Sequence, residues 1–402
     1  MTSYEFSTLA KGSRASENFR LTNLGRDVSG RFAIHLTGSS AFSIRSTGCT
    51  GKTKVGGRKW CRVTLVYAPR GAGSRDHAVL TATRKHRTAA SLEISGCSAS
   101  GGPVYWVAGG GTVRKGLFAA GCITTITTLA SGQSPTSLAA GRTHVYWTDY
   151  GHYPDFNKAV KEVPIGGGRV TTLAIGLSPD SVAVDGKHVY WADAGSDSFS
   201  VDGTLNEIPV GGGKVTTLAS DQSDPLSVSV DGTHVYWVNR GSYDGHDGTV
   251  NEVPISGGSV TTLVSGQTFD FASLAVDGTY VYWTNTMDGT VNEVPIGGGS
   301  VTTLAGAQSF PLSVAVHGTH VYWVNENAGT VNEVPLGGGS VTTLASGQNY
   351  PQSLAVDAKH VYWVNVGDGG ASGGVNEVPP GGGTVNIVAR DQAYPVLVAV
   401  RP

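Results

Sequence analysis

The chain contains 402 residues, of which 58 are glycine and only 14% are charged. Because 39% of the residues are apolar, a disordered or collagen-like chain is excluded, and no run of about 18 apolar residues is present to span a membrane. Two methionines and a lack of Ala/Glu/Lys/Leu-rich stretches leave little sequence for long helices. The composition predicts an all-β protein that is too long for one ordinary sandwich.

Charge is distributed unevenly along the chain. Residues 1–98 contain 16 Lys and Arg against 5 Asp and Glu, whereas residues 99–402 contain 12 against 25. This asymmetry predicts two domains, 1–98 and 99–402, with separate surface roles. One interpretation is that the basic domain docks on the acidic domain or that its charge only keeps it soluble. The other is that it contacts an anionic polymer, and we expect that polymer to be a cell wall rather than nucleic acid.

The basic domain consists of short strand-like segments that alternate with Gly-rich turns. They start at residues 19–25 and recur at residues 34–38, 41–44, 61–69 and 78–82. Alternating strands over about 95 residues predict an immunoglobulin-like β-sandwich.

The chain has four cysteines, Cys49, Cys61, Cys97 and Cys122, and none forms a C-x-x-C pair. A zinc ribbon or a thioredoxin-type site is therefore not expected. An even number of cysteines in a Gly-rich, charge-poor chain favours disulfides and an oxidising compartment. Met1 leads directly into strand-like sequence and not into an export signal. The protein is either cytosolic or exported by a signal that is absent from this chain, and because the cysteines favour disulfides we expect the second, a secreted or cell-surface protein.

The first hundred residues also resemble the choice-of-anchor D, or ASH-type, Ig-like domain of bacterial surface proteins. The similarity rests on the T-N-x-G turn, the L-T-G-x-x-x-F-x-I stretch, the Cys49 and Cys61 pair, and Tyr67-Ala68-Pro69. The resemblance implies a spacer or attachment module without an active site, and a Cys49–Cys61 disulfide. A bond between Cys97 and Cys122 would then fasten the linker to the following domain.

From residue 104 onward the sequence is repetitive. Val-Tyr-Trp occurs seven times, with tryptophans spaced by 41, 44, 46, 46, 40 and 40 residues, at Trp106, Trp147, Trp191, Trp237, Trp283, Trp323 and Trp363. Each repeat contains four short β-branched or aromatic pieces bounded by Gly, Asp or Pro. Four strands in a repeat of about 43 residues are typical of a β-propeller blade.

The first and last repeats are incomplete in complementary ways. The repeat at Val104 lacks the strand that precedes Val-Tyr-Trp elsewhere, and residues 397–400 are such a strand without a following repeat. Pairing the two leaves no open sheet edge at the seam. We therefore predict a seven-bladed β-propeller closed by the C-terminal strand, which deletion of residues 394–402 would open.

Val145-Tyr146-Trp147-Thr148-Asp149 resembles the signature of YWTD propellers, and Trp191-Ala192-Asp193 is similar. Later copies have asparagine where that signature has aspartate, at Asn239, Asn285, Asn325 and Asn365. YWTD propellers of the lipoprotein-receptor type are six-bladed, whereas this chain has seven copies. The resemblance implies propeller architecture and no particular function, because propellers include binders, lyases, hydrolases and scaffolds.

Repetition separates architectural residues from candidate ligand contacts. Five histidines precede Val-Tyr-Trp (His144, His188, His234, His320 and His360), and a glutamate recurs in the third strand (Glu162, Glu207, Glu252, Glu293, Glu333 and Glu377). We interpret both sets as packing and hydrogen-bonding positions. A lectin with one sugar pocket in each blade is the alternative, and placement inside strands argues against it.

The variable loops hold the candidate site. In a propeller, the loops after the second strand and those before the first strand share one face around the channel mouth. Aromatic, acidic and histidine side chains there suit sugars, peptides or other amphipathic ligands. The candidates are Tyr150, His152, Tyr153, Asp193, Arg240, Tyr243, Asp244, Asp270, Phe271, Tyr350 and Tyr394, with Asp180 and Asp224 on the same loops. Alternatively, the aromatic residues before Pro311, Pro351 and Pro395 fill gaps between blades.

Three functions follow from these patterns. The leading hypothesis is an extracellular recognition or adhesion protein, not an enzyme, whose loop face binds a glycan, peptide or protein. The second is a lyase or hydrolase at the channel mouth that uses His152, His246, Asp155 and Asp244, with or without a divalent metal. The third is a structural surface-assembly protein. No cofactor is expected in the leading case.

Overall fold

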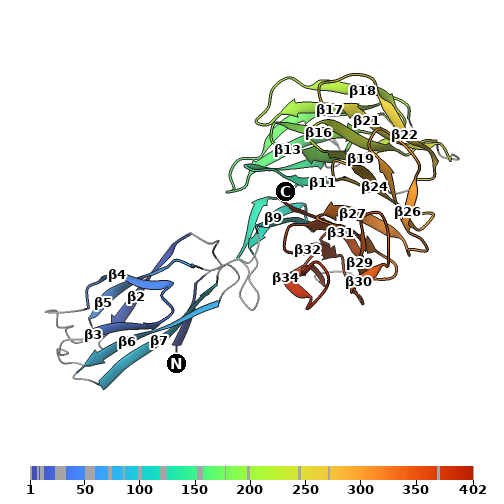
Figure 1. The fold of residues 1–402 in the computed structure, drawn as a ribbon. Coiled ribbons are helices and arrows are strands. Elements are labelled where there is room, and N and C mark those ends of the chain that lie inside the picture. The colour runs from blue at the N-terminus through green and yellow to red at the C-terminus, as the bar shows by residue number, and fades with distance from the viewer. Residues whose placement is uncertain are drawn as a thin grey trace. The chain divides into compact units, whose positions relative to one another are not determined.

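The computed structural model describes residues 2–6, 9, 13–22, 33–49, 59–70, 75–84, 87–97, 102–117, 125–151, 157–176, 178–196, 200–242, 246–269, 272–368 and 372–401. These residues form β-strands, turns and loops, and no helix occurs among them (Figure 1). The chain divides into two compact units, residues 1–103 with 116–126 and residues 104–115 with 127–402.

The first unit contains two sheets. One has the strand order β1 (Thr2–Glu5), β7 (Arg87–Cys97), β6 (Arg75–Arg84) and β3 (Ala33–Gly38); the other has the order β2 (Ala15–Thr22), β5 (Trp60–Tyr67) and β4 (Phe42–Thr47). Strand β1 is parallel to β7, and the remaining pairs are antiparallel. Strand β7 was not predicted, because it is rich in Ala, Ser and Gly and carries little β-propensity.

The core of this unit lies between the two sheets. Along β5, Cys61, Val63, Leu65 and Tyr67 are buried while the alternate residues are exposed or half-buried, as expected for a sheet with one solvated face. Phe6 and Ile94 from the other sheet join the same cluster.

The predicted Cys49–Cys61 disulfide is present, with Cα atoms 5.3 Å apart. Cys97 is also disulfide-bonded. Its expected partner, Cys122, lies outside the described residues.

The second unit contains seven consecutive four-stranded sheets (Figure 1). The strand at one edge of each sheet is β11 (Pro135–Ala140), β15 (Pro179–Val184), β19 (Pro225–Val230), β23 (Leu274–Val276), β27 (Pro311–His317), β31 (Pro351–Val356) or β35 (Leu397–Val400). The second strands, which carry Val-Tyr-Trp, are β12 (His144–Asp149), β16 (His188–Asp193), β20 (His234–Asn239), β24 (Tyr280–Asn285), β28 (His320–Asn325), β32 (Val361–Asn365) and β8 (Val104–Ala108). The edge strands of consecutive sheets are neighbours, and β35 neighbours β11, so that they form a closed ring, the arrangement of a β-propeller.

The two outer positions of each sheet are filled by the third and fourth strands. The third strands are β13 (Ala159–Pro164), β17 (Gly203–Pro209), β21 (Gly248–Pro254), β25 (Thr290–Pro295), β29 (Thr330–Pro335), β33 (Gly373–Val378) and β9 (Thr112–Leu117). The fourth strands are β14 (Thr171–Ile175), β18 (Thr216–Gln222), β22 (Thr261–Gln267), β26 (Thr302–Ala305), β30 (Thr342–Ala345), β34 (Asn386–Gln392) and β10 (Thr125–Ala130). A glycine-rich turn connects the third and fourth strands. In one sheet it contains Gly297, Gly298 and Gly299, whose φ angles of 82°, 92° and 152° lie in the positive range that glycine adopts readily.

The C-terminal strand occupies its predicted place. Strand β35 pairs antiparallel with β8, with Leu397 opposite Val107 and Val400 opposite Val104. The first repeat thereby gains the edge strand that its own sequence lacks.

The Val-Tyr-Trp repeat builds the cores between neighbouring sheets. Because side chains alternate along a strand, Tyr and Trp point to opposite faces of their sheet. Tyr236 of one sheet therefore shares a buried cluster with Trp283 of the next, and Tyr282 shares one with Trp323. The tryptophans are almost completely buried, so each sheet depends on both neighbours for its apolar contacts.

The repeated histidines and glutamates lie at packing positions, as predicted. The imidazole of His234 packs beside the ring of Tyr236, with centroids 6.1 Å apart. Glu333 is buried, and its Oε2 accepts a hydrogen bond of 3.2 Å from the N–H of Gly381 in the next sheet. The histidine contact lies within one strand, whereas the Glu333 hydrogen bond joins neighbouring sheets.

A serine in each of six edge strands also links consecutive sheets. Its Oγ accepts a hydrogen bond from a backbone N–H in the next edge strand. The pairs are Val182 with Ser137, Val228 with Ser181, Leu274 with Ser227, Val314 with Ser273, Leu354 with Ser313 and Val398 with Ser353, with distances of 3.0–3.2 Å. In β35 the same position is Leu397.

Candidate functional site

A polar pocket of about 290 Å³ lies among the loops of three consecutive sheets. We call it the loop pocket; the residues that define it are Tyr150, Lys158, Ser178, Asp180, Ser196, Asp224 and Arg240. They come from the loops after the second strands β12, β16 and β20 and from the segments that lead into the edge strands β15 and β19. The two kinds of loop expected to share one face therefore meet in this pocket.

A buried ion pair forms one wall. The Nε of Arg240 donates to Oδ2 of Asp224 at 2.8 Å, and the carboxylate side chain is only 1% exposed. Asp224 has a φ of 54°, its N–H donates to the carbonyl of Ser200, and its own carbonyl accepts the N–H of Arg240. The backbone thus fixes both partners, and the pair presents a rigid, oriented guanidinium to the pocket.

Asp180 lies beside this pair at the start of β15. Burial, together with the negative charge of Asp224, raises the pKa of Asp180 to about 6, although the positive charge of Arg240 acts in the opposite direction. Asp180 can therefore be neutral or ionised near physiological pH. It can donate a hydrogen bond in one form and accept two in the other.

Tyr150 and Lys158 form the opposite, more open wall. The Nζ of Lys158 lies 4.4 Å from the centroid of the Tyr150 ring and donates to Oγ of Ser178 at 3.3 Å. Tyr150 remains 45% exposed, so one ring surface is accessible to a ligand. Asp149 stabilises the loop that carries Tyr150, because its carboxylate accepts a hydrogen bond from the N–H of Gly151 and forms an ion pair with Lys161.

The loop pocket adjoins a larger cavity of about 750 Å³, which we call the channel. Six edge strands and the segment that leads into β23 line it, and Asp180 and Leu226 border both cavities. A ligand in the loop pocket would therefore lie beside the mouth of the channel.

The structure brings together part of the predicted site. Tyr150 and Arg240 line the loop pocket. Asp193 supports it instead, since its Oδ1 accepts the N–H groups of Ser178 and Gly195. The candidates that lie outside the described residues are His152, Tyr153, Asp155, Tyr243, Asp244, Asp270 and Phe271.

The remaining candidates are separate from the loop pocket. Tyr350 and Tyr394 precede the edge strands of two other sheets, and each is 51% exposed, so they do not fill gaps between sheets. His246 hydrogen-bonds through Nδ1 to Thr268. Neither tyrosine nor His246 lines the loop pocket.

Lys158 and Ser178 were missed by the sequence analysis. Each occurs in one loop only, and neither belongs to the aromatic, acidic and histidine classes that supplied every candidate except Arg240. Its positive charge could have identified Lys158, because residues 99–402 contain only 12 Lys and Arg against 25 Asp and Glu.

In the described part of the chain, no three His, Cys, Asp or Glu side chains gather closely enough to hold a metal ion. Among the same residues there is also no helix long and apolar enough to cross a membrane.

No known protein family and no curated protein matches the chain. Solved structures with low similarity include the nidogen/laminin complex, at 16% identity and a TM-score of 0.46 over 59% of this chain and 90% of that one. The calcium-binding protein regucalcin from Agrobacterium tumefaciens matches at 15% identity and a TM-score of 0.44, over 65% of this chain and 94% of that one. An auxiliary nutrient binding protein from Bacteroides thetaiotaomicron matches at 12% identity and a TM-score of 0.46, over 89% and 92%.

Proposed function

We propose that this protein is an extracellular recognition protein whose loop pocket binds a glycan. Residues 99–402 would form a seven-bladed propeller that presents the pocket. Residues 1–98 would form an Ig-like domain that anchors or spaces it at a cell surface. The disulfides support an oxidising location.

The observation that carries the proposal is the set of groups converging on the loop pocket. Lys158 and Arg240 donate, Asp180 accepts or donates, and the exposed ring of Tyr150 offers an apolar surface. Sugars present hydroxyl groups around a ring with apolar faces, and fixed polar groups beside an aromatic side chain match that chemistry. The Asp224–Arg240 pair and the support from Asp193 hold these groups in place before a ligand binds.

Glycan and peptide arrays probed with the full chain test this proposal. We expect glycan binding that falls at least about tenfold, or about 1.4 kcal/mol, in Tyr150→Ala and in Lys158→Ala. Tyr350→Ala and Lys187→Thr are the matched controls, because they remove an exposed tyrosine and an exposed lysine away from the pocket. Glycan binding that is unchanged in both pocket variants would refute the loop pocket as the site, and binding to peptides alone would refute a glycan ligand.

One observation favours hydrolysis as a second candidate function. A carboxyl group with a pKa of about 6 beside a second carboxylate has the properties of a general acid paired with an ionised partner. If the protein cleaves glycans, Asp180 donates the proton to the leaving oxygen. Incubation of a bound glycan should then release reducing ends, and Asp180→Asn should abolish the release even at glycan concentrations that saturate the variant.

A further inference from the structure

The solvent-facing side of the sheet β2–β5–β4 carries an unusual set of side chains. Alternation places every second residue of each strand on this side, and the burial pattern confirms it. We call this surface the arginine face; it comprises Ser16, Asn18, Arg20, Trp60, Arg62, Thr64, Val66, Ser43 and Arg45, with Arg14 and Arg70 at one end. All its charged residues are arginines.

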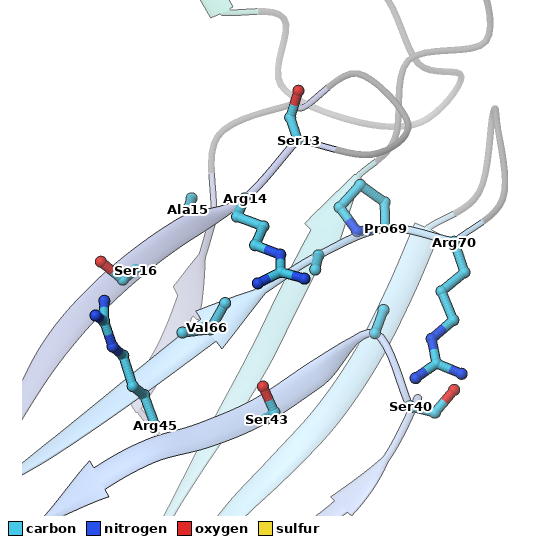
Figure 2. A pocket seen from close by; sticks show the side chains of 12 residues that line it. Ser13, Arg14, Ala15, Ser16, Ser40, Ser43, Arg45, Val66, Pro69 and Arg70 are labelled. Atoms are coloured by element: carbon cyan, nitrogen blue, oxygen red, sulfur yellow. The ribbon is translucent and has the colours of Figure 1, made fainter.

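One end of the arginine face is hollowed into a pocket of about 750 Å³ (Figure 2). Arg14, Arg45 and Arg70 line it from three different segments of the chain, together with four serines. Arginine guanidinium groups bind carboxylate or phosphate oxygens through paired hydrogen bonds, and hydroxyls add further donors and acceptors.

The acidic residues of this unit do not compensate these charges. Of the five in residues 1–98, Glu5, Asp76 and Glu93 lie on strands of the other sheet or their ends, where Glu5 pairs with Arg75. Glu17 alternates to the opposite side of β2 and accepts a hydrogen bond from Tyr4. The fifth, Asp27, lies outside the described residues. Within the described strands, the arginine face is therefore positive throughout.

The other end of the face presents an aromatic platform. Trp60 is 45% exposed, and the guanidinium of Arg20 lies 4.5 Å from its ring centroid, with that of Arg62 at 5.9 Å. Two guanidinium groups therefore pack against the indole. From Val66 in the pocket to Trp60 is six residues of extended strand, or about 20 Å.

We infer that the arginine face binds an acidic polysaccharide that runs from the pocket to Trp60. The guanidinium groups pair with its carboxylates, the Ser, Thr and Asn side chains with its hydroxyls, and the indole packs against a sugar ring. Inorganic polyphosphate would use the charges but not the indole, and it offers no hydroxyls along its length to match the polar side chains. This site is independent of the ligand proposed for the loop pocket.

Binding of polygalacturonate to the full chain, with neutral dextran for comparison, tests the inference. We expect Arg14→Ser/Arg45→Ser/Arg70→Ser to lose at least about tenfold in affinity, and dextran not to bind. The matched control Arg169→Ser/Lys187→Thr/Lys214→Ser removes three exposed charges from the other unit and installs the residue types of sister repeats, such as Ser300 and Thr279. It should bind as the parent does, as should Tyr150→Ala, which reports on the loop pocket alone.

Trp60→Ala distinguishes a polysaccharide from other polyanions. It should weaken polygalacturonate binding severalfold and leave binding of inorganic polyphosphate unchanged. Equal losses in the two triple variants would show general charge attraction and overturn the inference. Tighter binding of polyphosphate or single-stranded RNA than of polygalacturonate would overturn the assigned ligand class. All the changed side chains are exposed, so an unchanged thermal midpoint confirms that each variant is folded.

Discussion

One backbone position carries three different residue types in four sheets of this propeller. The residue before the proline that begins an edge strand has a positive φ in four sheets, where it is Asp224, Phe310, Tyr350 or Tyr394. For the first three, its carbonyl accepts an N–H from the loop after the second strand. The backbone hydrogen bond is retained while the side chain varies, so the fold can present an acid, a phenyl or a phenol at equivalent places. Only the sheet with Asp224 has an arginine, Arg240, opposite it.

Asp180 should make stability depend on pH. Its pKa of about 6 in the folded chain exceeds the ordinary value of 3.8, so folding binds a proton between these values. The contribution of this group to stability is therefore highest below pH 4 and is lost as the pH rises through 6. Two pKa units correspond to at most about 3 kcal/mol, and partial exposure reduces this to about 1–2 kcal/mol.

Asp180→Asn should accordingly raise the free energy of unfolding at pH 8 by about 1–2 kcal/mol and leave it nearly unchanged at pH 4. Urea titrations at both pH values measure the difference. Asp368→Asn, at an exposed loop position, is the control and should have little effect at either pH. An equal gain at pH 4 and pH 8 would contradict the raised pKa.

At the scale of the strand, a serine in six of the seven edge-strand segments joins one sheet to the next. Ser273→Ala should leave the N–H of Val314 without its acceptor and lower the free energy of unfolding by about 1 kcal/mol. Urea midpoints measure this loss, with Ser300→Ala in an exposed turn as the control. Ser181 and Ser313 contact different sheets, so the losses of Ser181→Ala and Ser313→Ala should add. A loss no larger than that of Ser300→Ala would mean that these hydrogen bonds contribute nothing net.

The elements were predictable where the sequence repeats. Val-Tyr-Trp identified the second strands because β-branched and aromatic residues recur at one period, and the spare strand at Leu397 indicated its pairing with the first repeat. Strand β7 does not repeat and carries weak β-propensity, so no pattern marked it. The loop pocket was predictable only in part. Its face followed from topology, but the meeting of Asp180, Asp224 and Arg240 depends on loop conformations in three sheets that no sequence period encodes.

At the scale of the molecule, each sheet of the propeller is stabilised by contacts with both neighbours. The tyrosine of one sheet and the tryptophan of the next share a buried cluster, so no sheet has a complete core of its own. The ring is closed through β35, which adds backbone hydrogen bonds to β8, apolar contacts of Leu397 and Ala399, and the hydrogen bond from Val398 to Ser353. Stability at this seam therefore depends on a short segment at the end of the chain.

Deletion of residues 394–402 should open the ring. It removes every contact of β35 and exposes the edge of β8, whose N–H and C=O groups then pair with a strand of another molecule. We expect a thermal midpoint lower by at least about 5 °C, since a loss of 1 kcal/mol shifts a domain of this size by about 2–4 °C, together with oligomers in light scattering. Deletion of residues 401–402 alone is the control, because both lie beyond β35.

A synthetic peptide of residues 394–402 should restore the midpoint and the monomer of the truncated chain, since it can pair with the same edge of β8. An unchanged midpoint in the long truncation would show that the seam does not depend on this strand.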